Sequence, residues 1–214
     1  MNYPKVVGEF ETVRKLLEGY SISRFGDGEF KMADGKGYVR EDPNPRIARE
    51  LSSILVAPSE TCLVGIPTMD KSGPKFSSWA RHEKRFAGML SESMTYYSAF
   101  ISRPDSAPWI MVREFAELMQ ELWAGKKAVV ICEPDNSLLR VVGKAARKVE
   151  HIECPSSGSY AHIADFRKAV LKAKPDIALL SVGPTATCLA HRLSNRVQAI
   201  DLGSAGGFLR KLLA

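Results

Sequence analysis

The sequence predicts an α/β protein in which a mostly parallel β-sheet is covered by helices on both faces. Two observations lead to this prediction. Short apolar runs typical of strands alternate with segments of helical periodicity along most of the 214 residues, and the alternation is clearest over roughly the last ninety. Parallel strands need crossover connections, and right-handed crossovers place helices on both faces of one sheet.

The first half of the chain shows this alternation less regularly. Apolar residues recur at helical spacing from Phe10 to Tyr20, and the run SISRF that follows is strand-like. A second helix is expected over residues 45–56, before a strand in TCLVGIP. The middle region, about residues 71–123, is expected to be mostly helical, with an interruption at the proline-containing segment SAFISRPDSAP.

The second half contains four apolar runs that are predicted as strands: KKAVVIC, EHIEC, DIALLSVG and RVQAID. Helical segments are expected between them at residues 138–149, 161–173 and 184–193. In sheets of this kind, ligands bind beyond the carboxyl ends of the strands. The residues directly after each strand are therefore the first candidates for a functional site.

Length and composition suit one domain that spans residues 1–214, because 45% of the residues are hydrophobic and 25% are charged. No apolar run approaches the ~18 residues that a membrane span needs, and the N-terminus lacks an apolar signal region. We therefore expect a soluble, cytoplasmic protein. The net charge of +6 favours phosphate-bearing partners but is too diffuse to establish nucleic-acid binding.

The cysteines and histidines form no metal or redox motif. Cys62, Cys132, Cys154 and Cys188 are far apart in the sequence, with no CxxC pair, and the histidines show no HxxxH or HExxH spacing. Three of the cysteines lie in or beside apolar runs, which predicts buried thiols in a reducing compartment. GxGxxG, P-loop, GxSxG and kinase signatures are also absent.

The segment RFGDGEF, directly after the first predicted strand, is one candidate site. Asp27 and Glu29 stand two residues apart between glycines, and both carboxylates turn toward one point if the backbone there is extended. Paired carboxylates suit Mg²⁺ or Mn²⁺, above all when phosphate oxygens complete the coordination shell. Arg24 could contribute a guanidinium to a carboxylate or phosphate. The alternative is a surface turn with solvated charges, which spacing alone favours.

The segment GPTAT, which opens the last predicted helix, is the second candidate site. Pro184 stands at the first helical position, where its missing N–H costs nothing. The free N–H groups of the first turn and the helix dipole form an anion site, to which Thr185 and Thr187 add hydroxyls. The alternative is an ordinary turn between strand and helix in which the threonines only cap the helix.

Weaker signals stand after the other predicted strands. Glu133 follows AVVIC, near Asp135 and Asn136, either of which could instead be a helix N-cap. Asp201 ends RVQAID, where a carboxylate could bind a sugar hydroxyl or act as a base. The remaining candidates, for which a plain loop or a solvated charge is the alternative, are Ser156 and Ser157 in CPSSGSY and Arg103 in FISRP.

The sequence resembles the GT-D-type bacterial glycosyltransferase family over about residues 21–203. Three segments carry the resemblance, in this order along the chain: SISRFGDGEF, SAFISRP and LLSVGPTATCLAHRLSNRVQAIDLG. In that family an Arg-aromatic-Gly-Asp-Gly-Glu segment supplies an Asp-x-Glu motif for metal and sugar nucleotide, and a Gly-Pro-Thr-Ala-Thr turn lies near the C-terminus. The resemblance implies a Rossmann-like α/β fold, a nucleotide-diphospho-sugar donor of the UDP-linked type, and Mn²⁺ or Mg²⁺ as cofactor.

Carried over to this chain, the resemblance implies that Asp27 and Glu29 hold the metal or the diphosphate. Asp201 is the candidate for the general base that activates an acceptor hydroxyl. The implied donor-binding residues are Arg24, Gly26, Gly28, Arg103, Glu133, Ser156, Ser157, Gly183, Pro184, Thr185 and Thr187.

The sequence departs from the family pattern on the acceptor side. Family members continue past the last strand with an Asp-x-Gly-His-x-Asp-like stretch, whereas Asp201 is followed here by LGSAGG. The resemblance implies a glycan or glycoprotein acceptor. The basic residues of the first half, including RHEKR, leave room for hydroxymethylated DNA instead, although such a run is usually a solvated helix face. A non-catalytic nucleotide-binding module is a further alternative.

Overall fold

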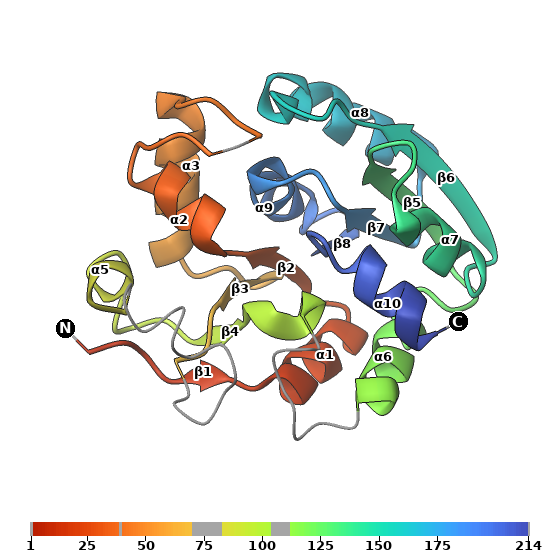
Figure 1. The fold of residues 1–214 in the computed structure, drawn as a ribbon, viewed down its shortest axis with the longest axis horizontal. Helices are drawn as coiled ribbons and strands as arrows, with labels where there is room; N and C mark the ends of the chain where they lie inside the picture. The colour runs from red at the N-terminus through yellow and green to blue at the C-terminus, as the bar shows by residue number, and fades with distance from the viewer. Residues whose placement is uncertain (1, 39, 70–82, 104–111, 214) are drawn as a thin grey trace.

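The computed structural model describes residues 2–38, 40–69, 83–103 and 112–213. Its centre is one sheet of eight strands in the order β1-β4-β3-β2-β8-β7-β5-β6, and every pairing is parallel (Figure 1). The predicted fold class is therefore confirmed. The strands are β1 (Val6–Val7), β2 (Ser21–Arg24), β3 (Cys62–Ile66), β4 (Tyr96–Ser98), β5 (Lys127–Cys132), β6 (Lys148–Glu153), β7 (Ile177–Leu180) and β8 (Gln198–Asp201).

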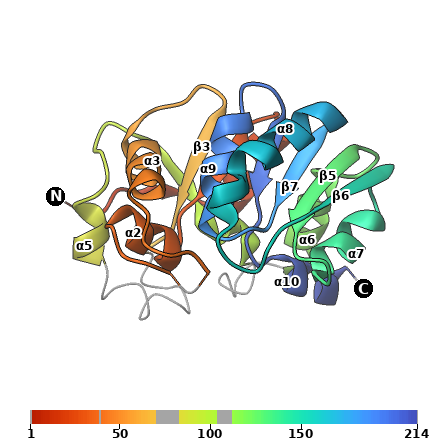
Figure 2. The ribbon, with the colours of Figure 1, turned by 90° about the horizontal axis from the view of Figure 1, so that it is seen from above.

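Helices cover both faces of this sheet (Figures 1 and 2). One face packs against α2 (Asp27–Ala33), α3 (Pro45–Val56), α5 (Glu83–Ala87), α8 (Ile163–Ala173) and α9 (Pro184–Leu193). The other face packs against α1 (Glu9–Leu17), α6 (Val112–Glu121), α7 (Ser137–Gly143) and α10 (Gly206–Leu212). Two short 3₁₀ helices, η1 (Ala99–Ser102) and η3 (Ser159–His162), follow β4 and precede α8.

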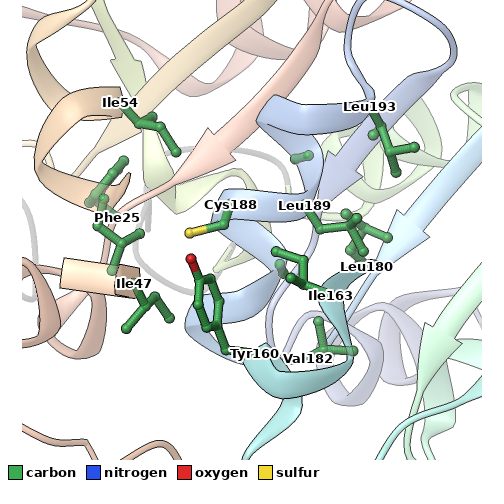
Figure 3. Close-up of a cluster of buried hydrophobic side chains, with 14 of the residues drawn as sticks. Phe25, Ile47, Ile54, Tyr160, Ile163, Leu180, Val182, Cys188, Leu189 and Leu193 are labelled. Atoms are coloured by element: carbon green, nitrogen blue, oxygen red, sulfur yellow. The ribbon is translucent and has the colours of Figure 1, made fainter. Parts of the chain in front are cut away.

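The central strands are apolar on both sides because both faces of the sheet are covered. In β5, Val129 and Ile131 belong to the core under α8 and α9, while Ala128, Val130 and Cys132 belong to the core on the opposite face. Figure 3 shows the first of these cores, in which side chains of α3, α9 and η3 meet.

The chain reverses direction across the sheet between β5 and β7. From β5 the chain passes through α7 to β6 on one side, and it then returns through α8 to β7 on the other side of β5. The two helices lie on opposite faces. Such a switch point leaves a crevice at the carboxyl ends of the two strands. The loops after β5 and β7 are therefore held at the edge of that crevice.

The structure corrects two predictions about secondary structure. The middle region expected to be mostly helical contains α5 and α6, but also the strand β4, which is too short to show a periodicity; residues 70–82 and 104–111 lie outside the described residues. The helix expected over 138–149 ends at Gly143, and strand β6 begins at Lys148. Most of β6 lies in EHIEC, which is predicted as a strand, but its first two residues, Lys148 and Val149, fall in the predicted helix.

Candidate active site

A cavity of about 460 Å³, lined by both polar and apolar residues, lies at the carboxyl ends of six strands. The loops after β4, β3, β2, β8, β7 and β5 all contribute to it. Of the predicted site residues, nine line this cavity: Arg24, Gly26, Asp27, Gly28, Glu29, Arg103, Glu133, Gly183 and Asp201. The sequence segments RFGDGEF and GPTAT, more than 150 residues apart, therefore reach one cavity.

Helix α2 begins at Asp27, so the extended backbone expected for RFGDGEF is wrong. Gly26 is the N-cap residue, and its N–H donates to Glu29 Oε2 at 2.8 Å in a capping box. Residues two apart on a helix do not face each other, so Asp27 and Glu29 do not form a side-by-side pair. Both nevertheless line the cavity, because it lies at the N-terminus of α2.

The two carboxylates of this first turn differ in their surroundings. Asp27 Oδ2 lies 2.5 Å from Lys31 Nζ, one helical turn further on, and both side chains are well exposed. Glu29 is partly buried, and burial together with the nearby charge of Asp201 raises the pKa of its carboxyl to about 7. Glu29 therefore keeps its proton to a higher pH than an exposed glutamate does.

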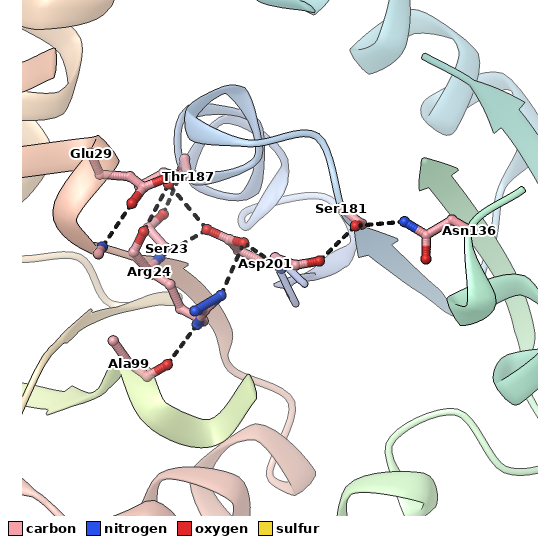
Figure 4. Close-up of polar contacts among 10 residues, drawn as sticks. Ser23, Arg24, Glu29, Ala99, Asn136, Ser181, Thr187 and Asp201 are labelled. Atoms are coloured by element: carbon pink, nitrogen blue, oxygen red, sulfur yellow. Dashed lines mark hydrogen bonds and ion pairs between the residues drawn. The ribbon is translucent and has the colours of Figure 1, made fainter. Parts of the chain in front are cut away.

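Arg24, at the end of β2, is held from several sides (Figure 4). Its Nε donates to the carbonyl oxygen of Ala99 at 2.8 Å, and its Nη1 lies 3.5 Å from Asp201 Oδ1. Gly203 leaves room for this arrangement, since a Cβ there would lie 2.7 Å from Arg24 Nη1. The guanidinium is thereby fixed on the cavity wall with little freedom.

Asp201, which the sequence analysis names as the candidate general base, has a buried carboxylate. It is only 3% exposed, and its carboxylate accepts hydrogen bonds from the backbone N–H of Arg24 at 3.2 Å and of Gly203 at 3.1 Å. The hydroxyl of Thr187 lies 3.1 Å from Oδ2. Burial raises the pKa of Asp201, and the Arg24 charge opposes this rise.

The GPTAT segment contributes to the cavity through Gly183 alone. Gly183 has φ +59°, which favours glycine, and it is the N-cap residue of α9. Thr185 and Thr187 are fully buried, and neither they nor Pro184 line the cavity. The Thr187 hydroxyl is 2.9 Å from the carbonyl oxygen of Arg24, and that of Thr185 is 3.4 Å from Glu41 Oε2. The threonines thus hold the cavity wall from behind.

Besides Pro184, Thr185 and Thr187, two more predicted residues lie outside the cavity, and Arg103 lines it. Ser156 and Ser157 are exposed and do not line it. Arg103, after η1, lines the cavity and stacks on the ring of Phe208 in α10, with 4.9 Å between its Cζ atom and the ring centre.

Sequence reasoning missed the place of several residues in the cavity. It named Asn136 only as a candidate N-cap, and Asn136 does cap α7, where its Oδ1 accepts from the Leu138 N–H at 2.9 Å. Asn136 and Ser181 follow β5 and β7, and they form a hydrogen-bond chain in which Asn136 Nδ2 donates to Ser181 Oγ at 3.2 Å and Ser181 Oγ donates to the Gly203 carbonyl at 2.6 Å (Figure 4). The strand-end rule that located Glu133 could have found both residues. The other cavity residues that the sequence analysis did not name include Tyr38, Arg40, Ser102 and Ser204.

Tyr38 and Arg40 lie on the loop between α2 and α3, for which no sequence signal exists. The Tyr38 ring packs against Gly28, where an added Cβ would lie 3.0 Å from it. Arg40 Nη1 reaches across to Glu133 Oε1 at 2.6 Å. The loop therefore forms one wall of the cavity.

The oxygen ligands on the wall of this cavity suit a hard divalent cation in part. Within the described ranges, no group of three or more His, Cys, Asp or Glu side chains is placed to hold a metal ion. Asp27 and Glu29 supply hard oxygen ligands on the cavity wall. Because Mg²⁺ is commonly held by one or two carboxylates together with substrate phosphates, these residues fit such an ion when a phosphate-bearing ligand is bound.

Comparison with known proteins identifies the family of this chain. The sequence model of a family described as "Glycosyltransferase GT-D fold" matches residues 22–206, which is most of the chain. This chain belongs to the GT-D glycosyltransferase family. The resemblance inferred from RFGDGEF and GPTAT is thereby confirmed.

Two curated relatives of this GT-D chain come from streptococci. "Probable glycosyl transferase Gly" of Streptococcus gordonii is 27% identical over 88% of this chain and 30% of its own length. "Glycosyltransferase GlyD" of Streptococcus pneumoniae serotype 4 is 25% identical over 93% of this chain and 26% of its own length. The chain thus spans about a quarter to a third of the length of these relatives.

Solved structures show the same fold. One, described as the "highly conserved domain of unknown function 1792" with "a distinct glycosyltransferase fold", superposes with a TM-score of 0.87 at 26% identity and covers 99% of this chain and 83% of that one. Another, "A New Glycosyltransferase (DUF1792) from Streptococcus sanguinis", has a TM-score of 0.82 at 24% identity, covering 97% and 86% of the two chains. Within the described part of the GT-D chain, no helix has the length and apolarity to cross a bilayer.

Proposed function

We propose that this GT-D chain transfers a sugar from a nucleotide-diphospho-sugar, specifically a UDP-linked one, to an acceptor hydroxyl. One observation carries the proposal: three arginines, four carboxylates and Gly183, the N-cap residue of α9, line a single cavity at the carboxyl edge of the sheet. Its volume of about 460 Å³ lies within the range of small-molecule sites, roughly 300–1,000 Å³. Cations and helix dipoles are the groups that stabilise a departing diphosphate.

Arg24 and Gly183 are assigned to the diphosphate. The Arg24 guanidinium is already oriented by Ala99 and Asp201, so little side-chain entropy is lost when it binds a phosphate. Gly183 places the first turn of the ten-residue helix α9 at the cavity, where backbone N–H groups favour an anion. Arg103 adds a second guanidinium at the cavity rim.

Asp27 and Glu29 are assigned to a Mn²⁺ or Mg²⁺ ion. When bound, such an ion would supply positive charge that offsets the charge developing on the leaving nucleotide. Lys31 binds Asp27 Oδ2, so the ion competes with Lys31 for this oxygen. Glu29 keeps the tip of α2 in place through Gly26.

Asp201 is better suited to positioning than to proton abstraction. Its carboxylate is buried and holds the backbone and side chain of Arg24, the Thr187 hydroxyl and the Gly203 N–H. A general base needs reach to the attacking hydroxyl. We therefore assign Asp201 the role of orienting Arg24 for the diphosphate.

The acceptor is proposed to be a glycan or glycoprotein, in keeping with the glycosyltransferase names of the relatives. The four cysteines are buried free thiols, which supports a reducing compartment such as the cytoplasm. A salt titration separates the DNA alternative: a glycan-specific enzyme shows no steep dependence of DNA binding on salt, whereas a DNA enzyme does.

The test is turnover of UDP-sugars, as transfer or hydrolysis, in the presence of Mn²⁺. Asp27→Asn is expected to lower turnover by ~10²-fold or more, because it removes a charge that stabilises the leaving group through the ion. Asp34→Asn is the control, since Asp34 caps the other end of α2 and does not line the cavity. Full activity of Asp27→Asn would contradict the assignment. Tight Mn²⁺-dependent binding of UDP without turnover would favour the non-catalytic module.

A further inference from the structure

Ser102, the last residue of η1, carries a polar group that the described residues leave without a partner. The residue lines the cavity and is 1% exposed, and its hydroxyl has no hydrogen-bond partner among the residues that the structure describes. By contrast, Ser98 at the start of η1 bonds to both Glu9 and Phe100. Because a buried polar group without a partner is costly and rare, Ser102 points to a ligand.

The position of Ser102 follows from the strand order. Ser102 follows β4, and β4 is two strands away from β2, the strand that carries Arg24. Because neighbouring strands are ~4.8 Å apart, Ser102 lies about 10 Å from β2 along the edge of the sheet. The loop after β5, with Glu133 and Asn136, is three strands from β2 in the opposite direction. The groups assigned to the diphosphate, Arg24 and Gly183, come from strands between these two ends.

The two ends differ in chemistry. Toward β5 the cavity has the Arg40–Glu133 ion pair, whose carboxylate suits the ribose of a nucleotide. The Tyr38 ring, 37% exposed, packs against Gly28 at the start of α2. Toward β4 the cavity has Arg103 and the neutral hydroxyl of Ser102, which stands three residues after Ala99, whose carbonyl oxygen accepts a hydrogen bond from Arg24 Nε. A nucleotide-diphospho-sugar placed with its ribose toward Glu133 extends its sugar toward Ser102.

We infer that Ser102 hydrogen-bonds a hydroxyl of the transferred sugar and helps to determine which donor is accepted. This inference rests on the proposed function, since it places the sugar of the same donor. A donor that lacks the matching hydroxyl leaves Ser102 unpaired and is rejected.

Calorimetry with UDP, UDP-glucose, UDP-galactose and UDP-N-acetylglucosamine, each with Mn²⁺, tests the inference. Ser102→Ala is expected to weaken binding of the preferred UDP-sugar about 10-fold and to change UDP binding less than about twofold. The exposed Ser53→Ala of α3 is the matched control and leaves all four ligands unaffected. An equal loss for UDP, or no loss for any sugar, would overturn the assignment.

Deoxy analogues of the preferred donor test the wild-type protein itself, whatever the stability of the variant. One analogue is expected to bind the wild type about 10-fold more weakly than its parent, and to show no further loss with Ser102→Ala. Equal binding of every analogue to the wild type would overturn the inference and leave the proposed function standing. A wild-type protein that binds none of the four nucleotides would overturn both.

Discussion

The segments RFGDGEF and GPTAT are equally prominent in the sequence, yet they serve the cavity differently. Five residues of the first segment beyond Arg24 reach the cavity wall: Phe25, Gly26, Asp27, Gly28 and Glu29. In the second segment only Gly183 does, and the hydroxyls of Thr185 and Thr187 point to protein groups. The comparison shows that a motif can act by positioning another motif: Thr187 holds the strand end that carries Arg24.

The largest effect on stability is expected at the ion pair between Arg24 of the first segment and Asp201 of β8. Arg24→Met leaves the Asp201 carboxylate buried without its cation, and we expect the free energy of unfolding to fall by about 3 kcal/mol. Adding Asp201→Asn should recover part of this loss, because the uncompensated charge disappears. Denaturant titration measures the free energy of unfolding of the single and the double variant. If Arg24→Met is as stable as the wild type, the ion pair does not organise this wall.

Thr187→Val distinguishes a positioning role from a ligand-binding role for GPTAT. It removes the hydroxyl near Arg24 and Asp201 with little change of shape, and we expect a loss of about 1–2 kcal/mol of stability with weaker UDP binding. Thr187→Ser keeps a hydroxyl and should restore both the stability and the UDP binding. Thr185→Val, which loses a longer contact at 3.4 Å, should cost less. Weaker UDP binding at unchanged stability would instead place the Thr187 hydroxyl on the ligand.

Glu29→Gln sharpens the contrast between the carboxylates of RFGDGEF through pH. Because burial raises the pKa of Glu29 from 4.5 to about 7, the folded metal-free protein binds more protons than the unfolded chain between these values. Wild-type stability therefore falls as pH rises through this window and is level above it. The glutamine variant keeps an acceptor for Gly26 and should be more stable by about 1–2 kcal/mol at pH 8, but not at pH 4. Thermal melts across this range provide the measurement; parallel curves for the two proteins would refute it.

The smallest effect is expected outside both segments. Ser156→Ala and Ser157→Ala change exposed side chains that do not line the cavity, so stability should stay within about 0.5 kcal/mol and UDP-sugar turnover should be unchanged. A loss of turnover in either variant would show that the donor site extends beyond the cavity described.

Much of the site could be predicted because strand ends and short motifs are local features. The rule that ligands meet the carboxyl ends of parallel strands located Gly183, Glu133 and Asp201 correctly at the cavity. It could not show that Asp201 is buried against Arg24, since that depends on the parallel pairing of β2 with β8, far apart in the chain.

The sequence by itself determined the parallel α/β fold, the family and the two segments that meet, because periodicity, turn residues and motif spacing are properties of neighbouring residues. The tertiary structure alone decided which side chain of each segment faces the cavity and which holds the wall. Helix α2 separates Asp27 from Glu29, and the burial of α9 turns Thr185 and Thr187 inward. Orientation and burial are set by packing between distant elements, and no local pattern encodes them.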